Sequence, residues 1–347
     1  MKKILPNLTP LRFFLALFVL LFHLPEFAEN RGFPFYKGLP LFFKGTEAVY
    51  VFFTLSGFLI IRNLISEKKK TNTINLRKFY NNRVVRIFPL YYLVLIFGFI
   101  YYNFILQFFG FDYESSYNLI NGFLLGVFFF PNVLATYQPG GILEVLWSIG
   151  IEEQFYLLIA PLFFMIKTKY IFRFLILFTG LYFLIFHLDV IDLLAKYKMY
   201  FYYFSAGGIL AYCSLIKAPR IIYHLRYLSF LLFILIFFTN IFSDNLDSYL
   251  LHLLYTIVFS TTIYCLSKKP IKCLDNPIFN YLGNVSYGIY MYHAIVFQIV
   301  GFVFLKLTFL NEILFIFLFY FSVIGLTIII SILSYKYFES YFLRLKH

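Results

Sequence analysis

The chain has 347 residues, of which 62% are hydrophobic and only 13% are charged. Its mean hydropathy is +0.82, and its apolar share exceeds the roughly 45–50% of an ordinary soluble domain. This composition excludes a water-soluble globule and indicates a membrane protein. The formal net charge of +13 leaves nucleic acid, anionic lipid and an anionic cofactor as possible partners until the charges are located.

Hydropathy predicts an all-α polytopic membrane protein, a bundle of about ten transmembrane helices, because roughly 17–25 apolar residues cross a bilayer core as a helix. The predicted spans cover residues 9–27, 46–66, 83–107, 147–166, 171–187, 200–215, 227–242, 249–266, 282–305 and 312–335. We expect the first span to be retained rather than cleaved, since it contains Arg12 and ends in Pro25 and Glu26. Residues 1–347 are expected to form one integral-membrane domain with no appended soluble domain.

The basic residues predict the orientation of the bundle. With the N-terminus in the cytoplasm, 22 of the 29 Lys and Arg residues fall on the inner side and 6 on the outer side. This bias predicts that both termini are cytoplasmic. An extra span at residues 123–130 would reverse the later loops, so we interpret residues 108–146 as one long outer loop that dips into the bilayer, which is typical of a functional segment. The net charge then reflects topology and contact with membrane lipids, and no nucleic-acid partner is expected.

Two ionisable residues lie within the first span. Arg12 and His23 are 11 positions apart, or about 1100° of helix rotation, so they share one face with a rise of about 16.5 Å. Ionisable residues inside a bilayer are costly and are therefore functional hypotheses. The alternative is that Arg12 extends to the inner headgroups and His23 lies at the outer interface.

The second and third spans carry further candidates. Ser56 and Gly57 at the middle of the second span allow close approach by a ligand or, equally, by a neighbouring helix. Arg83 and Arg86 are three positions apart and share a helix face at the inner mouth of the third span. Two guanidinium groups there can hold phosphates or anchor the protein to anionic lipid.

The fourth and ninth spans contain polar residues at helical spacing. Glu152 and Tyr156 are four apart on one face of the fourth span. Ser286, Tyr290 and His293 share a face of the ninth span, with His293 near the middle of the membrane. A buried histidine satisfied by a tyrosine is the simpler interpretation of the second group.

Together these segments resemble the membrane acyltransferase-3 family. The resemblance rests on Leu11-Arg12 with ten residues before His23, the runs 52–59 and 83–91, Trp147-Ser148 followed by residues 152–156, and Leu282-Gly283 through Ser286-Tyr287 to His293. Members of that family transfer acyl groups, mostly acetyl from acetyl-CoA, to hydroxyls of surface glycans and lipid-linked sugars. The family often ends in a Glu-x-Pro tail, but Glu339 is followed here by Ser340-Tyr341, so no role is carried over to Glu339.

The resemblance and the spacing together give a set of predicted site residues. The predicted catalytic residues are His23, Arg12 and Glu152; the predicted acyl-CoA-binding residues are Arg83, Arg86 and Ser56; Tyr156, Ser286, Tyr290 and His293 are predicted to bind substrate or support the site. No metal site and no permanently bound cofactor are expected.

Two chemical routes are open for His23. A neutral imidazole can take the proton of an acceptor hydroxyl as the oxygen attacks the thioester. Alternatively, the imidazole attacks first and forms an acyl-histidine. Arg12, Tyr290 or Ser56 would stabilise the oxyanion.

The predicted function is a membrane O-acetyltransferase of the bacterial cytoplasmic (inner) membrane. It would move an acetyl group from cytoplasmic acetyl-CoA to a hydroxyl of an envelope polysaccharide or a lipid-linked saccharide. Coenzyme A is a polyanion, and the densest basic segment, Lys68 to Arg86, is predicted on the same side. Succinyl-CoA is an alternative donor, and a transporter or exporter of a small acylated or anionic solute is an alternative function.

Overall fold

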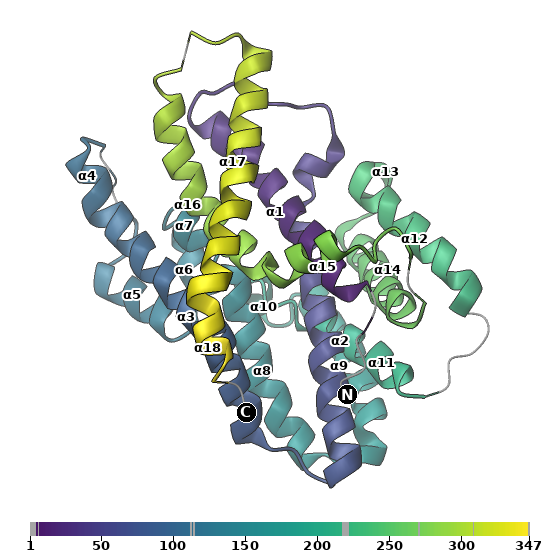
Figure 1. Cartoon of the computed structure of the whole chain (residues 1–347). Coiled ribbons are helices and arrows are strands. Elements are labelled where there is room, and N and C mark those ends of the chain that lie inside the picture. Colours follow the sequence, from purple (N-terminus) through teal and green to yellow (C-terminus); the bar gives the residue numbers. More distant parts are fainter. Residues whose placement is uncertain are drawn as a thin grey trace.

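The computed structural model describes residues 5, 7–111, 113, 115–216, 222–269, 271–307 and 309–345, without the side chains of residues 222–224. Every regular element in these ranges is helical, so the predicted all-α class is confirmed (Figure 1). Helices occur at all ten predicted places, and seven helical segments are long and apolar enough to cross a membrane. The structure therefore describes a multi-pass membrane protein.

The seven long segments match predicted spans. They are α1 (Leu8–Asn30), α2 (Gly45–Thr71), the segment Leu76–Phe108, the segment Thr168–His187, α14 (Ser248–Lys268), α16 (Ser286–Phe304) and the segment Glu312–Leu343. Within the composite segments lie α3 (Leu76–Ile100), a π-helical turn (Tyr101–Ile105), α4 (Leu106–Phe108), α9 (Ile171–His187), α17 (Glu312–Ser334), a second π-helical turn (Tyr335–Glu339) and α18 (Ser340–Leu343).

The other three predicted spans are not among the seven. They correspond to α8 (Trp147–Met165), α11 (Phe201–Ser214) and α12 (Ile222–Phe238). At 1.5 Å per residue, the 14 residues of α11 extend about 21 Å, less than a bilayer core of about 30 Å. The predicted count of ten spans is thus supported for seven. Shorter helices complete the described chain: α5 (Leu119–Val127), α6 (Pro131–Leu134), α7 (Gly141–Glu144), α10 (Asp192–Lys196), α13 (Ile241–Asn245) and α15 (Pro277–Asn284).

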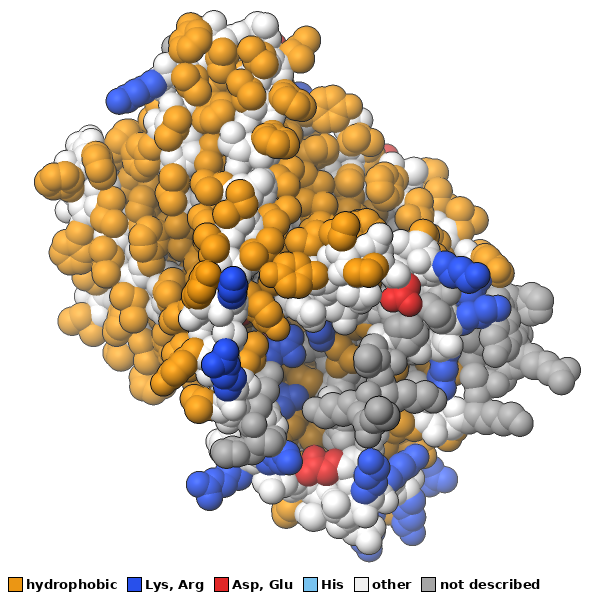
Figure 2. All heavy atoms as spheres, in the orientation of Figure 1, with side chains coloured by type: hydrophobic (Ala, Val, Ile, Leu, Met, Phe, Trp, Pro, Cys, Tyr) orange, Lys and Arg blue, Asp and Glu red, His pale blue; other side chains and the backbone are white. Residues whose placement is uncertain are grey.

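Charged side chains divide the molecule into two ends. Lys and Arg side chains gather at the lower end of Figure 2, where α2 ends in Lys68, Lys69 and Lys70 and α3 begins. We call this end the basic end and the opposite end the far end. Hydrophobic side chains cover the surface between the two ends in Figure 2, as expected for a surface that faces lipid. Phe317 and Phe321 of α17 are among the exposed hydrophobic residues. The predicted orientation places the basic end in the cytoplasm.

The predicted long outer loop folds back along α3. The hydroxyl of Tyr91 donates to the carbonyl of Gly126 (2.7 Å), and the ring of Phe129 stacks on that of Tyr91 with centroids 4.4 Å apart. Tyr91 lies near the middle of the segment Leu76–Phe108, so the loop reaches the middle of that span. Irregular backbone at this depth is tolerated only where it is buried in protein or lines a cavity. The loop therefore brings α7 and the start of α8 into the bundle.

Two glycines allow α2 and α11 to pack with their backbones in contact. A Cβ atom at Gly57 would lie 2.0 Å from the carbonyl oxygen of Phe204, and one at Gly207 would lie 2.1 Å from that of Thr54. No side chain fits at these distances. Gly57 therefore serves helix packing. With Gly57 facing α11, the neighbouring Ser56 faces α8 instead.

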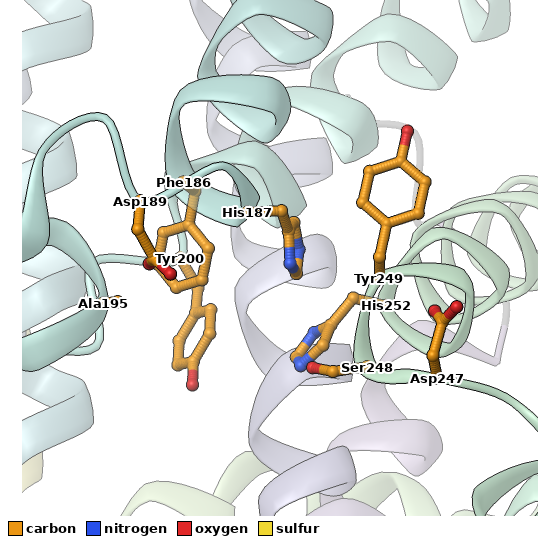
Figure 3. A pocket seen from close by; sticks show the side chains of 9 residues that line it. All are labelled: Phe186, His187, Asp189, Ala195, Tyr200, Asp247, Ser248, Tyr249 and His252. Atoms are coloured by element: carbon orange, nitrogen blue, oxygen red, sulfur yellow. The ribbon is translucent and has the colours of Figure 1, made fainter.

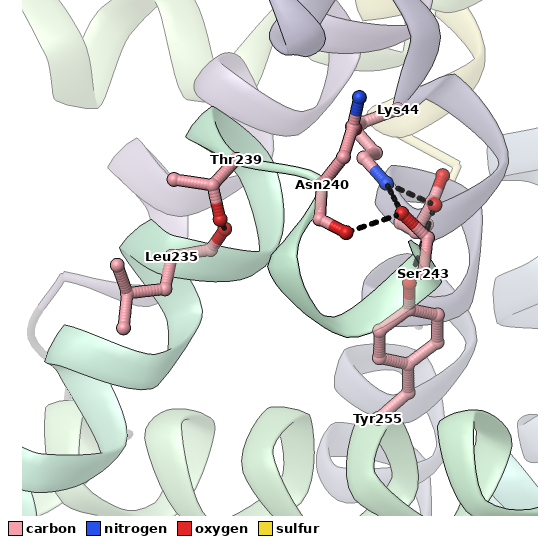
Figure 4. A network of polar contacts seen from close by, with 7 residues as sticks. Lys44, Leu235, Thr239, Asn240, Ser243 and Tyr255 are labelled. Atoms are coloured by element: carbon pink, nitrogen blue, oxygen red, sulfur yellow. Dashed lines mark hydrogen bonds and ion pairs between the residues drawn. The ribbon is translucent and has the colours of Figure 1, made fainter. Parts of the chain in front are cut away.

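A polar network joins α2 to α13 and α14 at the far end (Figure 4). The ammonium of the buried Lys44 lies 3.4 Å from a carboxylate oxygen of Glu47 and donates to the Ser243 hydroxyl at 3.4 Å. The hydroxyl of Tyr255 donates to the same Glu47 carboxylate at 3.4 Å. A buried ammonium requires such partners. This network fixes the start of α2 beside α14.

Replacing Gly57 with Ala is expected to lower the free energy of unfolding by about 1–3 kcal/mol, because the methyl group would force α2 and α11 apart. Gly180→Ala is the matched control, since a Cβ at Gly180 in α9 meets nothing within 4 Å; alanine in that helix should be neutral or stabilising. Thermal unfolding in detergent measures both variants. An unchanged melting temperature for Gly57→Ala would contradict the packing.

Candidate active site

Helix α1 carries Arg12 and His23 on one continuous stretch, as predicted. Arg12 is partly buried near the start of the helix, and its guanidinium lies within electrostatic range of Glu152 and Arg86. His23 lies three turns further along, and its side chain is 30% exposed, so its ring is accessible. The two residues therefore occupy two separate polar clusters, one toward each end of the bundle.

The far-end cluster forms around His23. Its Nδ1 atom lies 2.9 Å from a carboxylate oxygen of Glu26, one helical turn away. Its ring stacks on that of His293 with centroids 5.3 Å apart and planes 22° apart. A bond from Nδ1–H to the Glu26 carboxylate leaves Nε2 with its lone pair. This is the tautomer that a general base requires.

His293 is fully buried beneath His23. Its Nδ1 atom bonds to the backbone carbonyl of Tyr290 at 2.5 Å. Its Nε2 atom is buried and has no hydrogen-bond partner among the described residues. The expected tyrosine partner of His293 is therefore present as the backbone carbonyl of Tyr290, and it satisfies one of the two ring nitrogens.

Two further ionisable residues, from segments outside the long helices, lie near the far-end cluster. Glu144, at the end of α7, has its pKa raised, first because burial disfavours the carboxylate and also because the carboxylate of Glu26 is close. His23 and Lys198 oppose this rise. Lys198 also lies over the Trp147 ring, with Nζ 5.0 Å from its centre. Sequence reasoning missed Glu144 and Lys198, since nothing in their spacing places them beside α1.

A tyrosine links the two clusters through the middle of the bundle. The Tyr290 hydroxyl donates to the carbonyl of Val145 at 2.9 Å and lies 2.7 Å from the hydroxyl of Ser148. Both hydroxyl groups are buried. These contacts hold Tyr290 of α16 against the start of α8. The contacted Ser148 lies four residues, about one helical turn, before Glu152.

The second cluster lies toward the basic end. The hydroxyls of Ser56 and Tyr156 both donate to the carboxylate of Glu152, and the two hydroxyls contact each other. Ser56 comes from α2 and the other two from α8. The structure thus joins three residues that were selected from two separate sequence segments.

Arg83 and Arg86 stand at the edge of this second cluster. The Arg83 guanidinium lies over the rings of Phe79 (3.5 Å) and Tyr156 (5.1 Å), and its Nη1 atom donates to the carbonyl of Phe79 at 2.8 Å. Arg86 is exposed. Arg83 is therefore oriented by aromatic rings, whereas Arg86 is free to meet an anion from the basic end.

These contacts form one polar column through the bundle. From the basic end to the far end it contains Arg83, Tyr156, Ser56, Glu152, Arg12, Ser148, Tyr290, His293, His23 and Glu26. Tyr156, Glu152 and Ser148 recur every four residues on α8, which covers about 12 Å of the column. Polar groups are so arranged inside membranes where they line a substrate path or a reaction site.

Two predicted residues have other contacts. Ser286, predicted to support the site, donates its hydroxyl to the carbonyl of Gly283 at 2.9 Å at the start of α16. Glu339, to which no role was assigned, is buried; it accepts a bond from Ser334 at 3.3 Å and lies within electrostatic range of Arg86. Ser286 thus makes a local helix-end contact, and Glu339 adds a carboxylate beside the column.

Lys68 is the first residue of the basic segment 68–86 that we predicted on the donor side. It caps the C-terminal end of α8. Its ammonium donates to the carbonyls of Phe163 (2.5 Å), Phe164 (2.9 Å) and Ile166 (2.6 Å). The last carbonyls of a helix lack partners within the helix, and a lysine there satisfies them. Lys68 thus orients the helix that carries Glu152 and Tyr156.

Comparison with known proteins places the chain. Residues 6–335 match the family described as acyltransferase domain (acyltransferase-3). The chain belongs to this family. It is 30% identical over 177 residues to the peptidoglycan O-acetyltransferase OatA of Listeria monocytogenes, covering 49% of this chain and 26% of that protein. No solved structure matches the chain.

Two further relatives extend the similarity along the chain. A putative O-acetyltransferase of Staphylococcus aureus is 26% identical over 98% of this chain and 57% of its own length. A putative acetyltransferase of the Acidianus two-tailed virus is 27% identical over 80% of this chain and 84% of its own. The chain thus spans between about a quarter and somewhat over half of the length of the two bacterial relatives.

Replacing Lys68 with Met is expected to lower the free energy of unfolding by about 1–3 kcal/mol, because three carbonyls at the end of α8 lose their donor. Lys70→Met is the matched control, since Lys70 is exposed in the same helical turn. Thermal unfolding in detergent compares the two variants. Equal melting temperatures would show that Lys68 does not stabilise the end of α8.

Proposed function

We propose that this protein is a membrane O-acetyltransferase that moves an acetyl group from acetyl-CoA to a saccharide hydroxyl. The observation that carries the proposal is the polar column, which runs from Arg83 near the basic end to a histidine held by a carboxylate near the far end. The family assignment supports acyl transfer. The similarity to two bacterial O-acetyltransferases supports acetyl as the transferred group, and the Listeria relative, a peptidoglycan O-acetyltransferase, supports a cell-envelope glycan as the acceptor.

Charge supports entry of the donor from the basic end. Coenzyme A carries several phosphate charges, and Arg86 is exposed there next to the ring-stacked Arg83. In line with the predicted orientation, we place the basic end on the cytoplasmic side of the bacterial inner membrane and the far end on its outer side. The pantetheine arm of the donor would then extend along the column and bring the acetyl thioester to His23.

The chemistry follows from the tautomer of His23. With Nδ1–H bound to Glu26, Nε2 takes the proton of the acceptor hydroxyl while the hydroxyl oxygen of the acceptor attacks the thioester carbonyl carbon. The carbon–sulfur bond then breaks, and the proton passes to the thiolate, which leaves as free coenzyme A. The Glu26 carboxylate stabilises the imidazolium formed in between. An acyl-histidine route uses the same nitrogen as nucleophile.

The function is tested with purified protein in proteoliposomes, labelled acetyl-CoA and fragments of an envelope glycan. We expect label in the glycan, and we expect His23→Ala to reduce this transfer by at least about 100-fold while the protein still folds. Glu26→Gln should reduce kcat about tenfold or more, because the amide cannot stabilise the imidazolium.

Glu29→Gln is the control for Glu26→Gln, since Glu29 is exposed at the same end of α1. Full activity of His23→Ala would overturn the catalytic assignment. Solute flux without acetyl-CoA, together with no labelled product, would support the transporter alternative. A product mass that corresponds to succinyl would change the donor and leave the rest of the proposal in place.

Replacing Arg86 with Gln is expected to raise the KM for acetyl-CoA about tenfold, which corresponds to about 1.4 kcal/mol of binding, with a smaller effect on kcat. Arg77→Gln is the matched control, because Arg77 is exposed on the same helix one turn or more before the column. Initial rates at varied acetyl-CoA measure both. Equal KM values for the two variants would exclude Arg86 from the donor site.

A further inference from the structure

A cavity opens at the far end, outside the polar column. It has a volume of about 460 Å³ and lies where α9 ends and α14 begins (Figure 3). The side chains that determine its chemistry are His187, Asp189, Tyr200, Asp247, Tyr249 and His252. The proposed reaction uses none of these side chains.

Two histidines form the centre of the cavity. The rings of His187 and His252 lie with centroids 5.1 Å apart. The hydroxyls of Tyr202 and Tyr203 contact Nδ1 of His252 at 3.1 and 2.8 Å, which leaves Nε2 as its open nitrogen. Nε2 of His187 is buried and has no hydrogen-bond partner among the described residues. A buried polar atom without a partner costs free energy, which a ligand can recover.

Two carboxylates lie on opposite sides of the histidine pair, as Figure 3 shows. Asp247 bonds the backbone N–H of Leu250 through one oxygen at 2.8 Å and retains a second oxygen. Asp189 is in the left-handed region, with φ of 50°. A lining with two carboxylates disfavours phosphate and other anions. Among the described residues, these side chains form no group that could hold a metal ion.

This combination suits a ligand with many hydroxyl groups. Carboxylates accept hydrogen bonds from hydroxyls, open imidazole nitrogens donate or accept, and the rings of Tyr200 and Tyr249 supply apolar faces. A saccharide offers hydroxyl donors and acceptors around an apolar C–H face. A neutral saccharide therefore fits the cavity better than a lipid or a nucleotide.

One short segment connects the cavity to the far-end cluster. Tyr200 lines the cavity and packs its ring on those of Tyr50 (4.8 Å) and His252 (5.8 Å). Two residues earlier, Lys198 lies over Trp147 and acts electrostatically on Glu26. Residues 198–200 thus contact the cavity and the surroundings of His23. A saccharide that presents one hydroxyl to His23 would extend over this segment into the cavity.

We propose that the cavity is a second saccharide subsite, and that the acceptor is a chain of more than one sugar unit. The inference rests on the proposed function, because it assigns the cavity to the same acceptor. The sugar unit at His23 is acylated, and a neighbouring unit occupies the space between Asp189 and Asp247. The subsite selects for acceptor length and leaves the chemical step unchanged.

The test is the double variant Asp189→Asn and Asp247→Asn. Asparagine tolerates positive φ and caps a helix as aspartate does, so both local structures are retained while both charges are lost. The acceptors are glycan fragments from the envelope of the source cells, sorted into single units and longer chains. At saturating acetyl-CoA we expect the KM for longer chains to rise at least tenfold, with kcat and the KM for single units unchanged.

Asp244→Asn is the matched control, because Asp244 is exposed at the same end in α13 and does not line the cavity. Unchanged KM values for longer chains, or an equal rise for single units, would overturn the subsite. Calorimetric binding of the longer chains to the inactive His23→Ala variant separates this inference from the proposed function. Binding that the two Asp substitutions weaken supports the subsite even without acetyl transfer, and binding that they leave unchanged overturns it.

Discussion

The need to satisfy polar groups inside a bilayer governs this structure. A carboxylate or guanidinium without a partner is costly in hydrocarbon, so the charged residues of α1, α3 and α8 converge on one column. Glu152 accepts bonds from Ser56 and Tyr156, and His23 is bound to Glu26. The same contacts bring His23 and the guanidinium groups of Arg12 and Arg83 into one column through the protein.

Close backbone packing makes the column possible. Gly57 and Gly207 allow α2 and α11 to touch, which fixes the rotation of α2 and directs Ser56 toward α8. Lys68 closes the opposite end of α8 by satisfying its last carbonyls. Neither feature touches the proposed substrate. Both help to determine where the polar groups of the column lie.

The segment between α4 and α8 gives the column its far end. It folds back to the middle of α3 and buries Phe129 on Tyr91. The carbonyl of Val145 in this segment also holds Tyr290, one turn from His293, and Ser148 at the start of α8 contacts the same hydroxyl. A continuous transmembrane helix in this place would have no free backbone groups for such contacts. The contacts of the polar column therefore require irregular backbone at this place. The segment between α9 and α11 adds Lys198 to the far-end cluster.

The sequence by itself determined the helical class, the positions of the helices and the presence of Arg12 and His23 in one long helix, because hydropathy is a local property. It also indicated the family through five short segments. Local spacing would have found Glu26, one turn from His23. Only the tertiary structure decided that His293 stacks on His23 and that Glu144 and Lys198 come near. These contacts join residues from different helices and loops, whose relative rotation and depth no local pattern records.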